Sequence, residues 1–164
     1  MTWAGPRRQQ RSAGDTAIAA DVGARFFSGT MTVRKGQETA RTVIATYEQG
    51  NVALKVRKGA LDAYMTEQGI NRVIITYDLL VETRRDGDRI VIDTADFVFG
   101  PSGAYFNPPL LVVFAGDWVD SNPDIALYDE NGEAMEYRDS KSDSKIKIEV
   151  PHFSRYAYDS YNYY

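Results

Sequence analysis

The chain contains no cysteine and only one histidine, His152. The absence of cysteine excludes disulfides, thiolate catalysis and cysteine-based metal sites. A single histidine is too few for the histidine-rich sites that hold zinc or iron, so we expect no metal and no other cofactor. The sequence also lacks an apolar run long enough to cross a bilayer, and we therefore expect no membrane-spanning segment.

Charge of one sign is not in large excess, because the 164 residues carry a formal net charge of −4. A slightly acidic chain argues against nucleic acid as the main partner. The hydrophobic content of 43% and charged content of 26% are those of a globular protein, and the length fits a single domain. Tyrosine dominates the aromatic residues, which suits half-buried β-strands.

Short stretches with alternating apolar and polar residues follow one another along most of the chain. Turn residues separate them, as in Arg85-Asp86-Gly87-Asp88, and no long amphipathic helix is present. The pattern predicts an all-β protein, an antiparallel β-sandwich. The expected strands are 28–33, 41–47, 52–57, 70–81, 89–99, 110–114, 125–128, 134–137 and 145–150.

Three details of this prediction can be checked individually. Residues 60–68 are expected to form one short helical turn that ends at Gly69. The segment 129–133 contains Asn-Gly and is expected to be the turn of a hairpin between the strands 125–128 and 134–137. Residues 139–144 are polar and are expected to form a loop.

The two ends of the chain differ from this central pattern. Residues 1–25 are expected to form a flexible N-terminal arm with Trp3 and a basic cluster of Arg7, Arg8 and Arg11. An alternative is that this arm docks on a neighbouring subunit with Trp3 as its anchor. The first residues have no apolar core after the arginines, so they do not read as a signal peptide.

The sandwich is expected to span residues 26–158 and to be followed by a tyrosine-rich tail, 159–164. Five tyrosines stand between Tyr156 and Tyr164. Because tyrosine offers a large rigid face and a hydroxyl, this stretch is either a docking segment or a last strand with a frayed end.

Three segments in order resemble the ZU-five domain, the module shared by zonula occludens proteins, netrin receptors of the uncoordinated type and ankyrins. Residues 52–61, Val-Ala-Leu-Lys-Val-Arg-Lys-Gly-Ala-Leu, resemble its strand and following Gly-Ala-Leu turn. Residues 99–109, Phe-Gly-Pro-Ser-Gly-Ala-Tyr-Phe-Asn-Pro-Pro, resemble its Phe-Gly-Pro segment, and residues 152–156, His-Phe-Ser-Arg-Tyr, resemble the closing motif of bacterial relatives. The resemblance implies a β-sandwich with an interaction or envelope role.

The resemblance also implies one candidate reaction, self-cleavage between Phe153 and Ser154. In some relatives a His-Phe-Ser sequence cuts its own backbone by an N-to-O acyl shift. Ser154 Oγ would attack the carbonyl carbon of Phe153, and His152 would accept the hydroxyl proton as a general base. The alternative is structural: His152 hydrogen-bonds or caps the strand, Phe153 packs in the core, and Ser154 makes a local hydrogen bond.

Two further candidate sites have a simpler explanation. Asp117, Asp120 and Asp124 carry oxygen ligands that suit Ca²⁺, but their spacing is not that of a calcium loop, so a solvated turn is expected. A carbohydrate-binding sandwich would use Trp118 and exposed tyrosines, and only composition favours it.

The function expected first is a non-enzymatic structural or protein-interaction module of a bacterial envelope or surface protein. Its partner would be another protein or a second copy of the chain, bound through the arm or the tyrosine-rich tail. The expected location is extracellular or in the cell envelope, with the cytoplasm as the alternative. Self-cleavage at residues 152–154 is the second hypothesis, and carbohydrate binding is the third.

Overall fold

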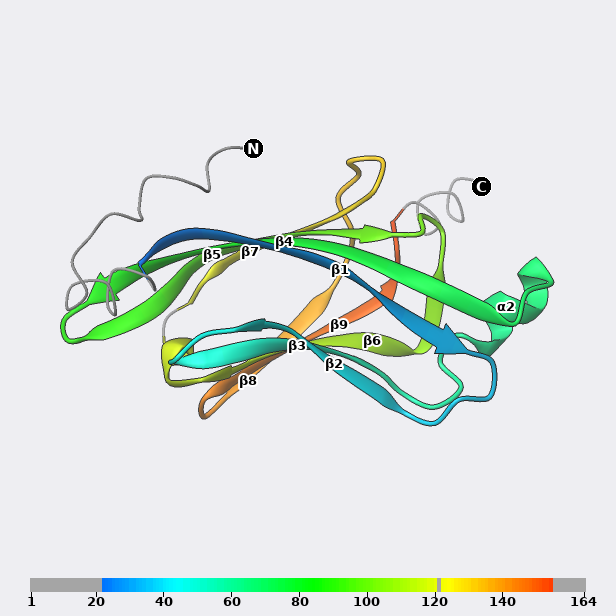
Figure 1. The fold of residues 1–164 in the computed structure, drawn as a ribbon, viewed down its shortest axis with the longest axis horizontal. Helices are drawn as coiled ribbons and strands as arrows, with labels where there is room; N and C mark the ends of the chain where they lie inside the picture. The colour runs from blue at the N-terminus through cyan, green and yellow to red at the C-terminus, as the bar shows by residue number, and fades with distance from the viewer. Residues whose placement is uncertain (1–21, 121, 155–164) are drawn as a thin grey trace.

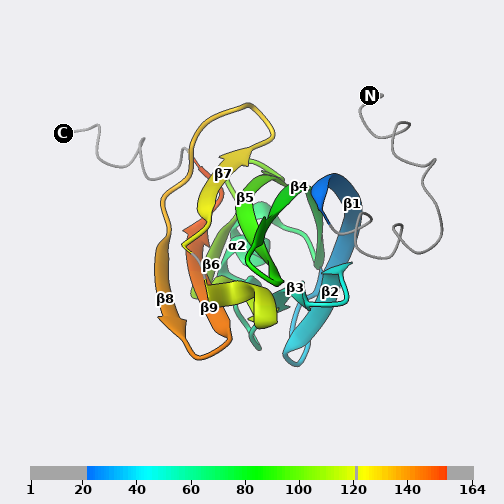
Figure 2. The same cartoon turned by 90° about the vertical axis from the view of Figure 1, so that its left-hand side faces the viewer.

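The chain folds into two β-sheets that face each other, as a computed structural model describes for residues 22–120 and 122–154 (Figure 1). The first sheet has the strand order β1-β4-β5-β7, and the second has the order β2-β3-β6-β9-β8. The elements are β1 Gly23–Arg34, β2 Ala40–Thr46, β3 Gly50–Val56, α2 Asp62–Gln68, β4 Arg72–Asp86, β5 Arg89–Gly100, β6 Tyr105–Gly116, η2 Asp117–Asp120, β7 Asp124–Asp129, β8 Arg138–Ser142 and β9 Lys145–His152. The end-on view in Figure 2 shows the two layers, and the expected β-sandwich is confirmed.

The alternation of side chains explains how the sandwich closes. In β4, Val73, Ile75, Leu79 and Val81 are buried and face the second sheet, while the residues between them are exposed or half-buried. A strand turns successive side chains to opposite faces, so one face of each sheet enters the core. Aromatic rings fill the centre of that core: Phe97, Phe99, Phe114, Trp118 and Phe153 are all fully buried.

The short helix and its end agree with the sequence. α2 begins at Asp62 and ends at Gln68, and Gly69 follows it with a φ of 70°. Only glycine adopts this left-handed conformation without a steric cost from a Cβ atom. The Arg85–Asp88 turn is also present, because Gly87 joins β4 to β5 with a φ of 66°.

One strand pair departs from the expected antiparallel arrangement. β7 pairs with β5 in parallel, from Thr94 opposite Asp124 to Phe99 opposite Asp129. β7 follows β6, which belongs to the second sheet, and the chain crosses back through η2 before β7 joins the first sheet. A crossover of this kind permits a parallel pair, whereas a tight hairpin cannot form one.

The hairpin expected between strands 125–128 and 134–137 is confirmed at its turn but not in its second strand. The Asp129 N–H donates to the Glu133 carbonyl, the Met135 N–H donates to the Leu127 carbonyl, both at 2.9 Å, and an antiparallel bridge joins Tyr128 to Ala134. Residues 134–137 do not form a strand. The chain instead leaves the first sheet after β7 and crosses to the second sheet, where β8 pairs with β9 (Figure 2).

The loop expected at 139–144 is also wrong for most of its length, because β8 runs from Arg138 to Ser142. All five residues of β8 are exposed at the edge of the second sheet, so no buried face imposes an alternating pattern on them. At the N-terminus, β1 begins at Gly23, so residues 23–25 belong to the first sheet rather than to an arm. Residues 1–21 and 155–164 lie outside the described part of the chain.

Candidate functional site

The last described residues of the chain lie where β9 ends, beside the turn between β5 and β6. β9 alternates buried Ile146, Ile148 and Val150 with more exposed residues and continues to His152. Phe153 and Ser154 follow it, and both are buried. The motif singled out in the sequence therefore lies at the edge of the core.

Phe153 is fixed by both its backbone and its ring. Its N–H donates to the Ala104 carbonyl at 2.7 Å, and its own carbonyl accepts from the Gly103 N–H at 2.9 Å. The ring stacks on Phe99 with 5.2 Å between centroids and meets Phe106 edge-on at 5.0 Å. The structure thus confirms that Phe153 packs in the sandwich.

The hydroxyl of Ser154 donates to a buried carboxylate, Asp129, at 2.6 Å. Asp129 Oδ2 also accepts from the hydroxyl of Ser102 at 2.9 Å, and Oδ1 accepts from the backbone N–H groups of Asn131 and Glu133, both at 2.9 Å. The Asp129 carboxylate therefore joins three segments: the turn after β5, the loop after β7, and the end of β9. We call Ser102, Asp129 and Ser154 the Asp129 cluster.

The environment of Asp129 favours its charged form. Burial is the largest single effect and by itself raises the pKa. Hydrogen bonds from Ser154, the Glu133 backbone, Ser102 and the Asn131 backbone act in the opposite direction, and their combined effect places the pKa below its ordinary value of 3.8. Asp129 is therefore an ionised hydrogen-bond acceptor at neutral pH.

This arrangement corrects one expectation about the site. The hydroxyl of Ser154 donates to Asp129, which stands 25 residues earlier in the chain, and not to a local acceptor. The Nε2 of His152 lies 3.7 Å from a carboxylate oxygen of Glu136, and the role of His152 as a base for Ser154 stays a prediction. Asp129 was assigned only to a turn in the sequence, and a contact over this separation leaves no local signal.

The backbone at Ser154 is unusual as well. Its φ is 69°, in the left-handed region that residues with a Cβ atom rarely adopt. Such a conformation costs about 1–2 kcal/mol for a residue other than glycine. The peptide bond between Phe153 and Ser154 therefore joins a carbonyl that accepts a hydrogen bond from the Gly103 N–H to a residue under modest backbone strain.

The structure places the side chains named for the other two candidate sites. Trp118 is completely buried, its Nε1 donates to the Ala115 carbonyl at 3.0 Å, and its ring packs on Tyr47. Its ring therefore offers no face on which a sugar could stack. No group of acidic or histidine side chains within 22–120 and 122–154 is arranged to hold a metal ion, Asp117 and Asp124 included.

An open hollow of about 610 Å³ lies between the β4–β5 hairpin and the turns next to it. Arg85, Arg89, Asp88 and Asp117 contribute to its lining, so charges of both signs are mixed there. Arg89 also donates a hydrogen bond to the carbonyl of Asp117. The hollow therefore has no preference for a ligand of one charge.

The expected docking elements fall outside the described residues. These are Trp3 and the arginine cluster in the arm, and the tyrosines of the tail. Among the residues that are described, no helix has the length and apolar character needed to cross a membrane.

Comparison with known proteins does not assign this site. No protein-family model, curated protein or solved structure matches the chain. The function must therefore be argued from the fold, from the Asp129 cluster and from the surface of the sandwich.

Proposed function

We propose that this chain is a non-enzymatic protein-interaction module of the β-sandwich type, and that the outer face of its first sheet is the contact surface. The observation that carries the proposal is a band of apolar side chains across that face. We further propose that the module is a relative of the ZU-five domain and works in the cell envelope or outside the cell, since the three matching segments occur in the expected order.

The band crosses all four strands of the first sheet on the side that faces away from the core. Phe26 on β1 pairs with Leu80 on β4, and Val98 on β5 pairs with Tyr128 on β7. Asp96 pairs with Leu80, so Leu80 and Val98 lie diagonally across neighbouring strands, within reach of each other. We call Phe26, Leu80, Val98 and Tyr128 the outer band.

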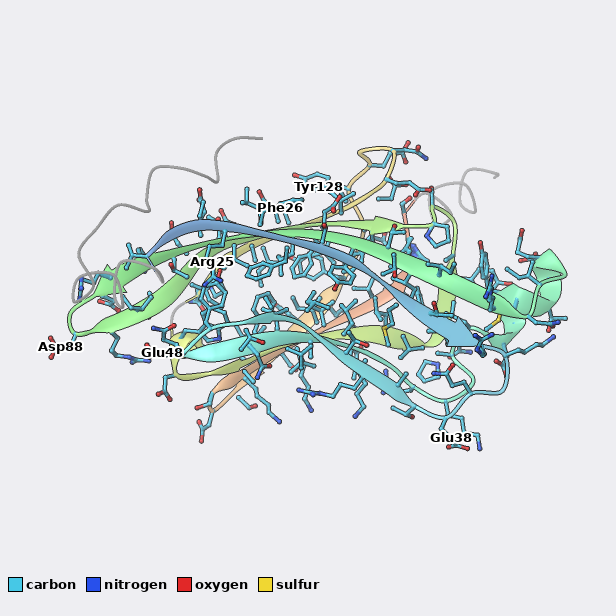
Figure 3. All side chains as sticks on the ribbon, in the orientation of Figure 1. Arg25, Phe26, Glu38, Glu48, Asp88 and Tyr128 are labelled. Atoms are coloured by element: carbon cyan, nitrogen blue, oxygen red, sulfur yellow. The ribbon has the colours of Figure 1, made fainter. Side chains whose placement is uncertain are left out.

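The two ends of the outer band are its most accessible parts. Phe26 is 48% exposed and Tyr128 is 37% exposed, whereas Leu80 and Val98 are half-buried (Figure 3). Single exposed apolar residues are common on protein surfaces, but a continuous set with aromatic ends is typical of interaction sites. Aromatic residues are also enriched at protein interfaces.

A capture experiment with matched variants tests this proposal. The immobilised full chain is expected to retain a specific protein from an extract of its native cells. The double variant Phe26→Ser, Tyr128→Ser should lose that protein by about tenfold or more, since aromatic contacts dominate interface energetics. Ile74→Ser is the control, because Ile74 is 45% exposed on the same sheet but lies outside the outer band.

The readout is the amount of the retained protein, measured by quantitative mass spectrometry. Both variants are expected to stay folded, because they change exposed positions, and each change should cost less than about 1 kcal/mol of unfolding free energy. Equal retention by all three proteins, or no specific retention by any, would refute the outer band as the contact surface.

A second candidate function is self-cleavage between Phe153 and Ser154. Three features favour it: the Ser154 hydroxyl donates to a carboxylate, the Phe153 carbonyl accepts from the Gly103 N–H, and Ser154 has a φ of 69°. A hydroxyl, an acceptor for its proton and a polarised carbonyl are the parts that an N-to-O acyl shift requires.

The energies available for the reaction rank self-cleavage as the second candidate function. Backbone strain at Ser154 supplies about 1–2 kcal/mol, and a good general base supplies a factor of about 10²–10⁴, which equals about 3–5 kcal/mol. Resonance of the peptide bond opposes its cleavage, and the strength of this resonance is shown by a rotational barrier of about 18–20 kcal/mol. Asp129 is in addition a poor base, because its lowered pKa leaves it little affinity for a proton at neutral pH.

A further inference from the structure

We propose that copies of this chain stack on one another head to tail, with the outer face of the first sheet of one copy bound to the outer face of the second sheet of the next. This inference rests on the proposed function, because it takes the outer band as the contact surface. It adds the identity of the partner, which is a second copy of the chain, and the surface of that copy on which the outer band lies.

The outer face of the first sheet is negatively charged. Three rows of paired residues cross its four strands, and they hold no lysine, arginine or histidine but four exposed carboxylates, those of Asp78, Glu82, Asp96 and Asp124. Partial burial raises the pKa of Asp96 above its ordinary value, and the charges of Glu82 and Asp124 raise it further. Carboxylates that oppose each other's ionisation are stabilised by a nearby cation.

The outer face of the second sheet carries the opposite charge. Three rows of paired residues cross it as well, and they hold the cationic side chains of Arg41, Lys55, Arg138, Lys145 and Lys147. The one carboxylate in these rows, Glu149, lies 3.1 Å from Arg138. We call these three rows the basic face. The basic face and the acidic face of the first sheet lie on opposite sides of the sandwich (Figure 1).

Apolar side chains lie between the cations of the basic face. They form a strip along the outer side of β6 that consists of Leu111, Val113 and Ala115. Lys55 on β3 and Lys147 on β9 flank this strip, and Val43 on β2, which is 43% exposed, joins it through Ala53. The outer band of the first sheet has carboxylates beside it in the same way. Both faces therefore combine apolar area with flanking charges, and the charges are opposite in sign.

A second copy of the chain matches the outer face of the first sheet in both respects. It brings cations to the carboxylates and apolar side chains to the outer band. Twisted sheets pack face to face at a spacing of about 10 Å, as the two sheets of a sandwich do. Opposite charges on the two surfaces would orient the copies and speed their encounter.

The stacking does not close at two copies. Because the two faces lie on opposite sides of each molecule, a pair of copies leaves an acidic face free at one end and a basic face free at the other. A contact between two different surfaces continues into a ring or an open filament. We therefore expect assemblies larger than a dimer.

The size of the contact predicts weak association. Four strands about 4.8 Å apart and three rows about 6.8 Å apart give a footprint of roughly 400 Å² on each copy. Stable complexes bury about 800 Å² on each partner. We therefore expect the assembly to form at high concentration and to dissociate on dilution.

Sedimentation velocity of the full chain tests this expectation at roughly 10–500 μM and low ionic strength. The average mass should rise with concentration beyond twice the mass of one chain, and salt at about 0.5 M should lower it by screening the charges. Lys145→Glu, Lys147→Glu should abolish the rise, since it places carboxylates opposite carboxylates. Lys35→Glu, Lys58→Glu is the control with the same change in charge, because both lysines are exposed in turns outside the basic face.

A mixture of two variants tests the head-to-tail arrangement. Phe26→Ser, Tyr128→Ser retains the basic face, and Lys145→Glu, Lys147→Glu retains the outer band. Each variant alone should remain largely monomeric. Their equimolar mixture should form one intact contact and reach the mass of two chains without exceeding it.

The stacking is overturned if the original chain stays monomeric, if either variant assembles like the original, or if the mixture forms no dimer. A monomeric chain whose retention on a heparin column depends on Lys145 and Lys147 would assign the basic face to a polyanion and would overturn the stacking as well. The capture experiment judges the proposed function separately. An unrelated protein retained through the outer band by a chain that stays monomeric would refute the stacking alone, whereas equal retention by all variants would refute the contact surface itself.

Discussion

Asp129→Ala is expected to lower the free energy of unfolding by about 3–5 kcal/mol, because it removes a buried ionised acceptor from its hydrogen-bond donors. Four donors lose their partner at once: the hydroxyls of Ser102 and Ser154 and the backbone N–H groups of Asn131 and Glu133. The hydroxyls can rotate to other acceptors, and water can reach exposed Asn131 and Glu133. The loss of unfolding free energy therefore stays well below four times the cost of one buried donor without an acceptor. The loss is still a large part of the stability of a typical domain.

Equilibrium unfolding in urea measures this loss. Asp124→Ala is the matched control, because Asp124 lies on the same strand but is exposed. Its removal is expected to change the unfolding free energy by no more than about 0.5 kcal/mol. If Asp129→Ala lowered the unfolding free energy no more than Asp124→Ala does, the Asp129 cluster would not hold the end of β9 in place.

The contribution of Asp129 has a defined pH dependence. Its folded pKa is lower than the ordinary value of 3.8, so its stabilisation is fully present above the unfolded pKa. This stabilisation is lost as the pH falls below the unfolded pKa and then through the folded pKa. The difference in unfolding free energy between the original chain and Asp129→Asn should therefore be constant from about pH 5 to 8 and shrink below about pH 4. A difference that grew in acid would contradict the assigned ionisation.

Phe153→Ala is expected to cost about 3–5 kcal/mol of unfolding free energy, the range for removal of a buried phenyl ring. The ring is completely buried and lies between Phe99 and Phe106, so no nearby side chain can collapse easily into its place. Phe153→Leu retains most of the volume and should cost less than about 1.5 kcal/mol.

Phe26→Ala provides the comparison for Phe153→Ala. It deletes the same ring from the outer face, where 48% of the residue is already exposed to solvent, and should cost less than about 1 kcal/mol. Urea unfolding of the three variants gives the order directly. Equal losses of unfolding free energy for Phe26→Ala and Phe153→Ala would contradict the assignment of Phe153 to the core and of Phe26 to an exposed contact surface.

The sequence predicted those parts of the fold that local patterns determine. The alternation in β4 identified its buried face, and Gly69 and Gly87 marked the end of the helix and the turn of a hairpin. These signals are local because side-chain direction and positive φ depend only on a few neighbouring residues. Burial of Phe153 also followed from its position after an alternating strand.

The parts that were missed depend on distant residues. β8 has no buried side chain and therefore no periodic pattern, so its strand conformation comes only from pairing with β9. The parallel pairing of β7 depends on where the chain crosses between sheets. The contact between Asp129 and Ser154 joins the end of β7 to the residue two positions after β9. The sequence motif suggested only His152 as the acceptor of the Ser154 hydroxyl proton.

The most direct test of a non-enzymatic module is the intact mass of the purified full chain during prolonged incubation at neutral pH. The proposed function predicts one mass, that of residues 1–164, in the original chain and in Ser154→Ala alike, because Asp129 binds the Ser154 hydroxyl without removing its proton. A time-dependent loss equal to residues 154–164, absent from Ser154→Ala, would contradict this account and establish self-cleavage at the Phe153–Ser154 bond.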